Sequence, residues 1–279
     1  MELWFTEAHP SSHRGLTFRV RRVLESKKSR YQQIDILETE DGERLFVLDG
    51  MVMLTTRDEF VYHEMLAHVA LFAHPAPKRV LIIGGGDGGT AREAIKHPTV
   101  EHVDLVDIDD DVFELSRRHL PETACSFDDP RVHLRAEDGA AFVRDAGEPY
   151  DVVLVDSTEP IGPGAVLFGA DFHRDIHRAL TPDGIMACQS DTPFFDGETI
   201  RTLHAAVRPI YRSLHLYLAA VPVYPSGLWS FTLGTKGGAA GVRPKALRTP
   251  PADWKLRYYS AEIHDACFAL PPFAADLTR

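Results

Sequence analysis

From residue 79 onward the chain alternates between short apolar runs and segments in which apolar positions recur every three or four residues. The continuous apolar runs Val80–Ile83 and Val152–Val155 are typical of strands buried on both faces of a parallel sheet. We predict strands over Arg79–Gly85, His102–Asp109, Arg131–Glu137, Tyr150–Asp156, Gly184–Ser190, Ser213–Val223 and Trp229–Thr235. The helices predicted between them cover Thr90–His97, Val112–Leu120, Ala140–Asp145, Asp171–Leu180 and Glu198–Tyr211. This alternation predicts an α/β fold with a Rossmann-like, doubly wound sheet, methyltransferase-like and seven-stranded, whose last two strands are antiparallel.

The first 56 residues show a different pattern, that of antiparallel strands. Apolar stretches over Ile34–Glu38 and Leu45–Leu48 flank the turn Asp41-Gly42, which is a strong hairpin signal. Asp58 is placed to cap a helix that runs to about Ala73. We therefore expect two domains: a small N-terminal β-domain over residues 1–56 and a Rossmann-like catalytic domain over residues 57–279.

Composition and charge narrow the class of partner. The formal net charge of −11 disfavours nucleic acid and suits small cationic ligands. The three cysteines are widely spaced, which argues against a disulfide framework or a zinc site. No apolar run approaches about 20 residues, so we expect no membrane span, and the first residues lack the features of a signal peptide. These features predict a cytoplasmic protein.

The segment after the first strand of the predicted sheet carries the fingerprint G-x-G-x-x-G in Gly84, Gly86 and Gly89. Such a loop usually binds an anionic phosphate at the N-terminus of a helix. Here, however, Asp87 stands inside the turn, where it would repel a pyrophosphate. The loop therefore favours a ligand that presents a positive charge.

Carboxylates follow the other parallel strands as well, in Asp107, Asp138, Asp156 and Asp191. Ligands of such folds bind at this edge of the sheet, and Asp107 occupies the position that usually holds a ribose diol. Capping of the next helix is an equally good explanation for Asp138 and for Asp109 taken singly. Taken together, Asp87, Asp107 and Asp156 predict a cationic ligand that carries a nucleoside.

Three ligand classes differ in the charge that they would bring close to Asp87. A nicotinamide dinucleotide would bring its pyrophosphate against that carboxylate, and S-adenosylmethionine would bring its own carboxylate there. Decarboxylated S-adenosylmethionine lacks that group, and its aminopropyl ammonium can pair with Asp87. We therefore favour this sulfonium nucleoside.

Several blocks of the sequence resemble the spermidine synthase (polyamine aminopropyltransferase) family, in order and over nearly the whole chain. The blocks are Leu48–Gly50, Arg57–Met65, Gly84–Gly89, Asp156–Pro163, Tyr224–Gly227 and Arg257–Pro271. The resemblance implies a small N-terminal β-domain, a Rossmann-like catalytic domain and a homodimer or homotetramer. Two positions depart from the family pattern, since Asp107 stands where Glu is common and Glu159 where Asp is common.

The resemblance also implies roles for particular residues. Gln32 contacts the nucleoside, Asp138 and Gly139 bind the adenine, and Pro163 lines the adenine side; Gly84, Gly86, Asp87 and Asp107 complete the nucleoside site. Tyr62, His63, Asp87 and Tyr224 belong to the diamine site, and Asp156 is the catalytic base. Glu159 follows Asp156 on a segment rich in Pro and Gly that we expect to act as a lid. It is the candidate partner of the distal ammonium, with an unpaired loop charge as the alternative.

The activity implied is that of a spermidine synthase. The aminopropyl group of decarboxylated S-adenosylmethionine passes to putrescine, and methylthioadenosine leaves. The sulfonium is already a good leaving group, so we expect neither a metal nor a cofactor. Three alternatives stay open: transfer to another diamine, methyl transfer from S-adenosylmethionine, and binding of polyamines without catalysis.

Overall fold

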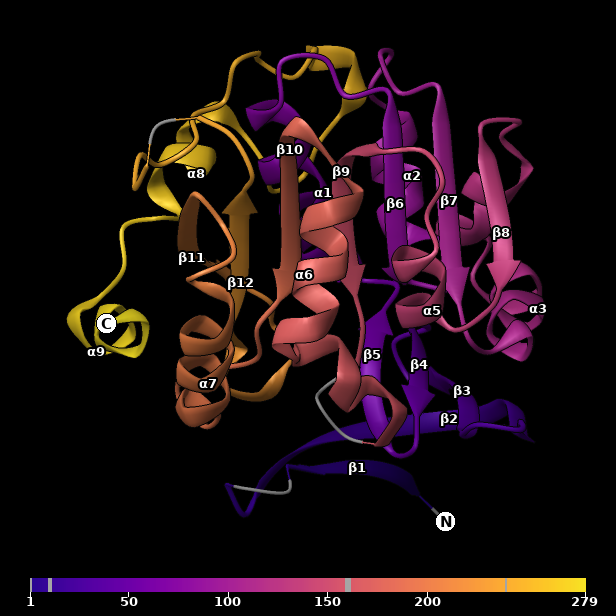
Figure 1. Ribbon diagram of the computed structural model, residues 1–279. Helices are drawn as coiled ribbons and strands as arrows, with labels where there is room; N and C mark the ends of the chain where they lie inside the picture. Colours follow the sequence, from indigo (N-terminus) through magenta and orange to yellow (C-terminus); the bar gives the residue numbers. More distant parts are fainter. Residues whose placement is uncertain (1, 10–11, 159–161, 239) are drawn as a thin grey trace.

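The structure, a computed structural model, describes residues 2–9, 12–158, 162–238 and 240–279. Two β-sheets carry the fold (Figure 1). The N-terminal sheet is an antiparallel meander of β1 (Leu3–His9), β2 (Arg14–Lys28), β3 (Gln33–Thr39), β4 (Arg44–Leu48) and β5 (Met51–Thr55). The predicted hairpin is confirmed, because β3 pairs with β4 around a turn in which Gly42 has a φ of 83°.

The second sheet has seven strands in the order β11-β12-β10-β9-β6-β7-β8. In chain order they are β6 (Arg79–Gly84), β7 (His102–Asp107), β8 (Val132–Ala136), β9 (Tyr150–Asp156), β10 (Leu180–Gln189), β11 (Ser213–Ala220) and β12 (Leu228–Thr235). Strands β6 to β10 are parallel, whereas β12 runs antiparallel to both β10 and β11. The predicted Rossmann-like sheet with its antiparallel final pair is therefore confirmed.

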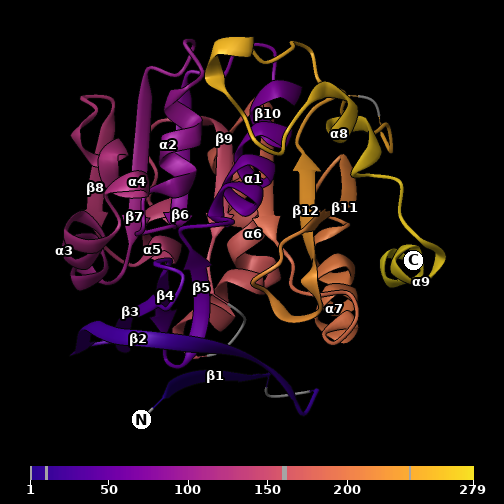
Figure 2. The same cartoon turned by 180° about the vertical axis from the view of Figure 1, so that it is seen from behind.

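Helices cover both faces of this sheet, as Figures 1 and 2 show from opposite sides. Successive side chains of a strand point to opposite faces, so Ile82 packs in one core and Ile83 in the other. The first core lies under α1 (Glu59–Ala73) and α2 (Gly89–Ile95), and the second under α5 (Gly139–Arg144), α6 (Ala170–Ala179) and α7 (Gly197–Val207). Burial on both faces explains the continuous apolar runs in the sequence.

The remaining elements are short, apart from the helix α3 after β7. They are α3 (Asp110–His119), α4 (Pro121–Ala124), η1 (Cys125–Asp128), η2 (Gly162–Phe168), η3 (Pro225–Gly227), η4 (Ala252–Trp254), α8 (Ala261–Ala266), α9 (Pro272–Ala275) and η5 (Asp276–Thr278). The N-terminal sheet lies beyond the carboxyl ends of the parallel strands (Figure 1). Ile36 and Phe46 of this sheet pack against Val112 and Leu115 of α3, which fixes it there.

Helix α1 begins at Glu59 and ends at Ala73, close to the predicted bounds. The expected side-chain cap from Asp58 is wrong, because its carboxylate accepts a hydrogen bond from the Thr55 hydroxyl instead. At the other end, the Arg248 guanidinium donates to the Leu71 and His74 carbonyls. A residue of the loop after β12 thus satisfies the carbonyl groups that every helix leaves unpaired at its C-terminus.

Glu64 ties the C-terminal segment to α1. Its buried carboxylate accepts the backbone N–H groups of Arg257, Tyr258 and Tyr259 at 2.9, 2.9 and 2.8 Å. Three such bonds to one carboxylate keep it satisfied away from water. Glu64 is therefore an anchor of the fold and does not line the cleft described next.

Candidate active site

A cleft of about 570 Å³ separates the N-terminal sheet from the carboxyl ends of β6, β7 and β9. Met51 and Met53 line it from the side of β5. The predicted site residues that line it are Gln32, Tyr62, His63, Gly84, Gly86, Asp87, Asp107, Asp138, Gly139, Asp156 and Tyr224. Glu159 and the side chain of Pro163 lie outside the described residues.

The glycine loop lies against the end of β9. Gly84 and Gly85 have φ angles of 79° and 67°, and the Gly85 N–H donates to the Asp156 carbonyl at 2.8 Å. A side chain at Gly84 would collide with that carbonyl, and one at Gly85 would come within 2.7 Å of the Asp156 carboxylate. Glycine at both positions therefore lets the loop that carries Asp87 approach Asp156.

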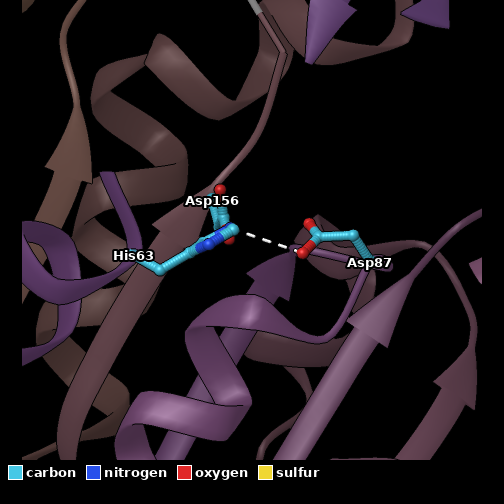
Figure 3. Close-up of side chains that lie close together, drawn as sticks. All are labelled: His63, Asp87 and Asp156. Carbon is cyan, nitrogen blue, oxygen red and sulfur yellow. Dashed lines mark ion pairs between the residues drawn. The ribbon is translucent and has the colours of Figure 1, made fainter. Parts of the chain in front are cut away.

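Asp87 already has two partners inside the protein, of which Figure 3 shows His63. Its Oδ1 accepts the Gly89 N–H at 2.8 Å and lies 3.3 Å from Nε2 of His63. Over the described residues, no hydrogen-bond donor reaches its Oδ2. Since Asp87 lines the cleft, this second oxygen can accept a hydrogen bond from a ligand.

His63 connects Asp87 to a buried ion pair. Its Nδ1 lies 2.6 Å from Oε2 of Glu59. The Oε1 and Oε2 atoms of Glu59 in turn accept N–H groups of Arg92 at 3.0 and 2.8 Å. The imidazole lies so close to Gly89 that any side chain there would collide with it. Burial opposes protonation of His63, but Asp87 and Glu59 outweigh burial and raise its pKa to about 10. His63 is therefore a cation at neutral pH.

Asp156 ends β9 and faces the cleft from a half-buried position. The Thr90 hydroxyl donates to its Oδ2 at 2.6 Å and fixes the carboxylate. Burial and the nearby Asp87 raise the pKa of Asp156, while protonated His63 acts against them. A carboxylate with a raised pKa is a stronger base, so Asp156 is suited to accept a proton from a ligand in the cleft.

Two tyrosines form the wall at the same end of the cleft. The Tyr62 ring meets the Tyr224 ring edge to face, with 5.6 Å between their centroids. The Tyr224 hydroxyl donates to the Met53 carbonyl at 2.7 Å, which ties the segment before β12 to the N-terminal sheet. Trp229 packs behind Tyr224 and is only 3% exposed. This end of the cleft is thus aromatic around a group of charged side chains.

Asp107 lies at the end of β7, away from the tyrosines. Its Oδ1 and Oδ2 accept the backbone N–H groups of Asp109 and Gly86 at 3.0 and 3.2 Å. Burial raises its pKa to about 6; the two N–H groups oppose this effect, and the carboxylates of Asp109 and Asp87 add to it. An oriented carboxylate at this strand end is the kind of group that accepts hydrogen bonds from ribose hydroxyls.

Gln32 reaches the cleft from the N-terminal sheet and is held by Asp109. The Gln32 side-chain amide and the Ser29 hydroxyl donate to Oδ2 of Asp109 at 2.9 and 2.6 Å. The other oxygen of Asp109 caps α3. Asp138 caps α5 and also lines the cleft, so the two explanations given for it are compatible. For Asp109 the capping explanation is correct.

Sequence reasoning missed the groups that hold the site residues in place. Glu59 precedes His63 by four residues on one helix, so its contact with the imidazole was readable from helical spacing. Thr90 and Arg92 lie on a different helix from Glu59, and the sequence contains no signal that pairs them with Asp156 and Glu59. Their roles depend on the packing of α2 against α1 and β9.

One group of side chains has the proximity that a metal site requires. Ligand atoms of His63, Asp87 and Asp156 lie within 4.8 Å of one another, the one such group among the described residues. A histidine binds a metal through an unprotonated ring nitrogen, whereas Asp87 and Glu59 raise the pKa of His63 to about 10 and so keep both of its ring nitrogens protonated at neutral pH. The arrangement therefore suits an organic cation better than a metal ion.

Over the described residues, no helix combines the length and the apolar character that crossing a membrane requires.

Two family models match the chain. The model described as "Spermidine synthase tetramerisation domain" matches residues 3–56, and "Spermine/spermidine synthase domain" matches residues 59–242.

Individual relatives are similar over their whole length. The "Polyamine aminopropyltransferase" of Shouchella clausii is 46% identical over 280 residues, covering 100% of both chains. That of Bacillus subtilis is 44% identical, covering 100% of this chain and 99% of the relative. A crystal structure of spermidine synthase in complex with the transition-state analogue AdoDATO has a TM-score of 0.92 at 40% identity. Spermidine synthase from Thermotoga maritima has a TM-score of 0.88 at 38% identity. Both solved structures match over 99% of this chain and 94% of theirs.

Proposed function

The chain belongs to the spermine/spermidine synthase family, and we propose that it transfers the aminopropyl group of decarboxylated S-adenosylmethionine to putrescine. The products are spermidine and 5'-methylthioadenosine. The observation that carries this proposal is the proximity of two carboxylates, Asp87 and Asp156, at one end of a cleft whose other end suits a nucleoside. Two cationic substrates repel each other as they approach, and fixed carboxylates offset that repulsion.

The nucleoside lies along the ends of β6 and β7 in this proposal. Adenine binds against Asp138, Gly139 and Pro163, and the ribose binds beside Gln32 and Asp107. The sulfonium then lies over the glycine loop, at Gly84 and Gly86. The carboxylate of Asp107, fixed by two backbone N–H groups, supports this placement.

The aminopropyl ammonium binds Oδ2 of Asp87. S-adenosylmethionine carries a carboxylate close to this ammonium, and Asp87 would repel it. A nicotinamide dinucleotide meets the same objection through its pyrophosphate. Methyl transfer from S-adenosylmethionine is therefore the weaker second candidate, although the fold would support it.

The reaction is a single displacement. A free alkylamine has a pKa of about 10 and is mostly protonated at neutral pH, so it must first lose a proton. Asp156 accepts that proton, and the amine lone pair then attacks the aminopropyl carbon. As the new C–N bond forms, the C–S bond breaks and its electron pair returns to sulfur, which leaves as neutral methylthioadenosine. A general base of this kind contributes on the order of 10²–10⁴-fold, and the step needs no metal or cofactor.

The acceptor lies on the aromatic side of the cleft. Tyr62, His63 and Tyr224 surround the nitrogen that reacts, and their positions around Asp156 support this assignment. The distal ammonium pairs with Glu159, which lies outside the described residues. We expect the segment that carries Glu159 to close over the acceptor as a lid.

The test is to incubate the protein with decarboxylated S-adenosylmethionine and putrescine and to quantify methylthioadenosine and spermidine together. Equal amounts of both products support the proposal. S-adenosylmethionine in place of the nucleoside should give neither product, and a methylated amine would favour the methyltransferase. Repeating the assay with cadaverine, agmatine and spermidine as acceptors identifies the preferred amine. Binding without products would favour the non-catalytic alternative.

We further propose that the enzyme is a homodimer or homotetramer assembled through residues 1–56, with residues 57–279 as the catalytic domain. The match of residues 3–56 to the tetramerisation model supports this proposal. So does the exposure of Leu3, Trp4 and Val23 on β1 and β2, at 48%, 54% and 52%. A cytoplasmic location also stays a prediction.

A further inference from the structure

His63 lies between two carboxylates, each of which is close to one nitrogen of its ring. Nδ1 lies 2.6 Å from Glu59, and Nε2 lies 3.3 Å from Asp87. An ionised carboxylate only accepts hydrogen bonds, so Nδ1 satisfies Glu59 only by carrying a proton, and a second proton on Nε2 would face Asp87 at ion-pair distance. An imidazole with protons on both nitrogens is a cation. The two carboxylates on either side of the ring therefore favour an imidazolium in the wall of the cleft.

We propose that Glu59 and Arg92 are positioning residues that keep His63 an imidazolium, and that this cation favours the neutral, reactive form of the amine bound at Asp156. The second half of this inference rests on the proposed aminopropyl transfer. Glu59 and Arg92 do not line the cleft, and they act through His63.

The hold on His63 comes from α1 and α2 together. Arg92 donates from both terminal nitrogens to the two oxygens of Glu59, which fixes the plane of that carboxylate. Glu59 is 6% exposed and His63 only 2%, so water does not compete for either group. Gly89 leaves just enough space for the ring. Loss of the proton on Nδ1 would leave a buried carboxylate against an unprotonated nitrogen.

The charged and titratable groups around the ring come from four elements. Glu59 and Tyr62 belong to α1, Arg92 to α2, Asp87 to the glycine loop and Asp156 to the end of β9. Their combined effect raises the pKa of His63 to about 10, with burial opposing the two carboxylates in contact. Ligand atoms of His63, Asp87 and Asp156 lie within 4.8 Å of one another.

The imidazolium of His63, within 4.8 Å of Asp156, lowers the pKa of an acceptor amine that binds there. An amine bound at Asp156 loses its proton more readily beside a positive charge, because the ammonium form is repelled. The same charge lowers the pKa of Asp156 and keeps it ionised to receive the proton. A like charge within about 4–6 Å shifts such a pKa by roughly one unit or more. Removing the cation should therefore move the acidic limb of the kcat profile to higher pH.

The first experiment follows His63 itself by NMR, with imidazole nitrogen-15 signals of the full chain recorded from about pH 6 to about pH 10. Comparison with His63→Gln assigns the signal. In the wild type it should stay doubly protonated up to about pH 9, and in Glu59→Gln it should titrate at least about 2 units lower. A wild-type His63 that titrates near its ordinary pKa of about 6.5 would overturn the proposal. So would a Glu59→Gln protein whose His63 titrates as in the wild type.

The second experiment measures kcat against pH at saturating substrates. In Glu59→Gln and in His63→Gln the acidic limb should shift upward by roughly one pH unit. Glu64→Gln is the matched control, because this buried carboxylate on the same helix binds backbone N–H groups and does not contact His63. Its thermal stability should fall, while its acidic limb should coincide with that of the wild type.

A loss of kcat in Glu59→Gln by the same factor at every pH would mean a purely structural role and would overturn the second half of the proposal. The failure of the proposed function has a different signature. A wild type that releases no methylthioadenosine would refute aminopropyl transfer, whereas the NMR titration of the same protein would still decide whether Glu59 holds His63 protonated.

Discussion

Two groups of carboxylates in this protein differ in how far the protein itself neutralises their charge. The first, the cleft carboxylates, consists of Asp87, Asp107 and Asp156. The second, the helix carboxylates, consists of Glu59 and Glu93 between α1 and α2. Burial raises the pKa of Asp107 to about 6, whereas the groups that contact Glu59 overcome burial and lower its pKa to about 2.

The two groups differ in whether cationic side chains of the protein contact the carboxylates. Glu93 is fully buried, yet it accepts hydrogen bonds from Arg92 and Lys96 at 2.8 and 2.6 Å and lies 3.0 Å from His68. The cleft carboxylates have one positively charged neighbour, His63, among the groups described around them. A buried carboxylate with a full set of internal partners stabilises the fold. One that lacks them is a candidate binding group for an external cation.

The largest expected effect comes from Asp156→Asn. The change keeps the shape but removes the proton acceptor, so kcat should fall by at least about 10²-fold at neutral pH. The free energy of unfolding should stay the same or rise, because a repulsion with Asp87 disappears. Release of methylthioadenosine and a urea titration measure the two quantities. Near wild-type turnover would show that Asp156 is not the base.

Glu93→Gln should have the opposite signature. The amide cannot replace the charge that Arg92, Lys96 and His68 contact, so unfolding should require about 2–3 kcal/mol less. Turnover of the folded protein should change by less than about threefold, because Glu93 does not line the cleft. Urea titration and steady-state kinetics at 25 °C provide the comparison. If turnover fell as in Asp156→Asn while stability held, the division between the two groups would be wrong.

Asp87→Asn tests whether a cleft carboxylate binds an external cation. Loss of a charge-assisted bond should weaken binding of decarboxylated S-adenosylmethionine roughly tenfold to 100-fold, by calorimetry. Discrimination against S-adenosylmethionine should shrink as well, since the repulsion of its carboxylate is lost. Methylthioadenosine is the matched control ligand: it has no ammonium, so its affinity should not change. An equal loss for all three ligands would indicate a distorted glycine loop instead.

The fold and the location of the site were predictable because strong local signals agree with the global fold. The apolar run in β6, the glycines after it and the carboxylate after each parallel strand place the cleft at one edge of the sheet. The antiparallel final pair followed from the short turn between β11 and β12. The start of β10 was harder to predict. The sequence predicts this strand from Gly184, whereas it begins at Leu180, directly after α6, with an irregular register up to Ile185.

What sequence reasoning could not supply is the pairing of charges between elements. Asp109 looked like a cap or a ligand group, and only the packing of the N-terminal sheet shows that it also holds Gln32 and Ser29. Asp58 looked like a cap, but the Thr55 hydroxyl is a nearer partner for it. In both cases a distant or competing donor decides the role, and its position depends on the tertiary structure.

The smallest expected effect concerns Asp107, at the end of the cleft where we propose that the nucleoside binds. Its pKa of about 6 lies inside an accessible pH range, because burial outweighs the two N–H groups that it accepts. Methylthioadenosine is the suitable probe, since it carries no ammonium and does not report on Asp87 or Asp156. As the pH falls from about 7.5 to about 5, Asp107 takes up a proton, and its hydrogen bonds to the ribose lose their assistance from charge.

Affinity for methylthioadenosine should therefore fall roughly fivefold over that range, since a neutral hydrogen bond is about half as strong as a charge-assisted one. Asp107→Asn should bind weakly at the higher pH and show no further loss on acidification. Asp107→Glu lengthens the side chain by one methylene and keeps the carboxylate, so it should keep a pH dependence. A wild-type affinity that stays flat down to pH 5 would mean that Asp107 does not bind the ribose in its ionised form. Asp107 would then resemble Glu93, with its charge satisfied by the protein alone.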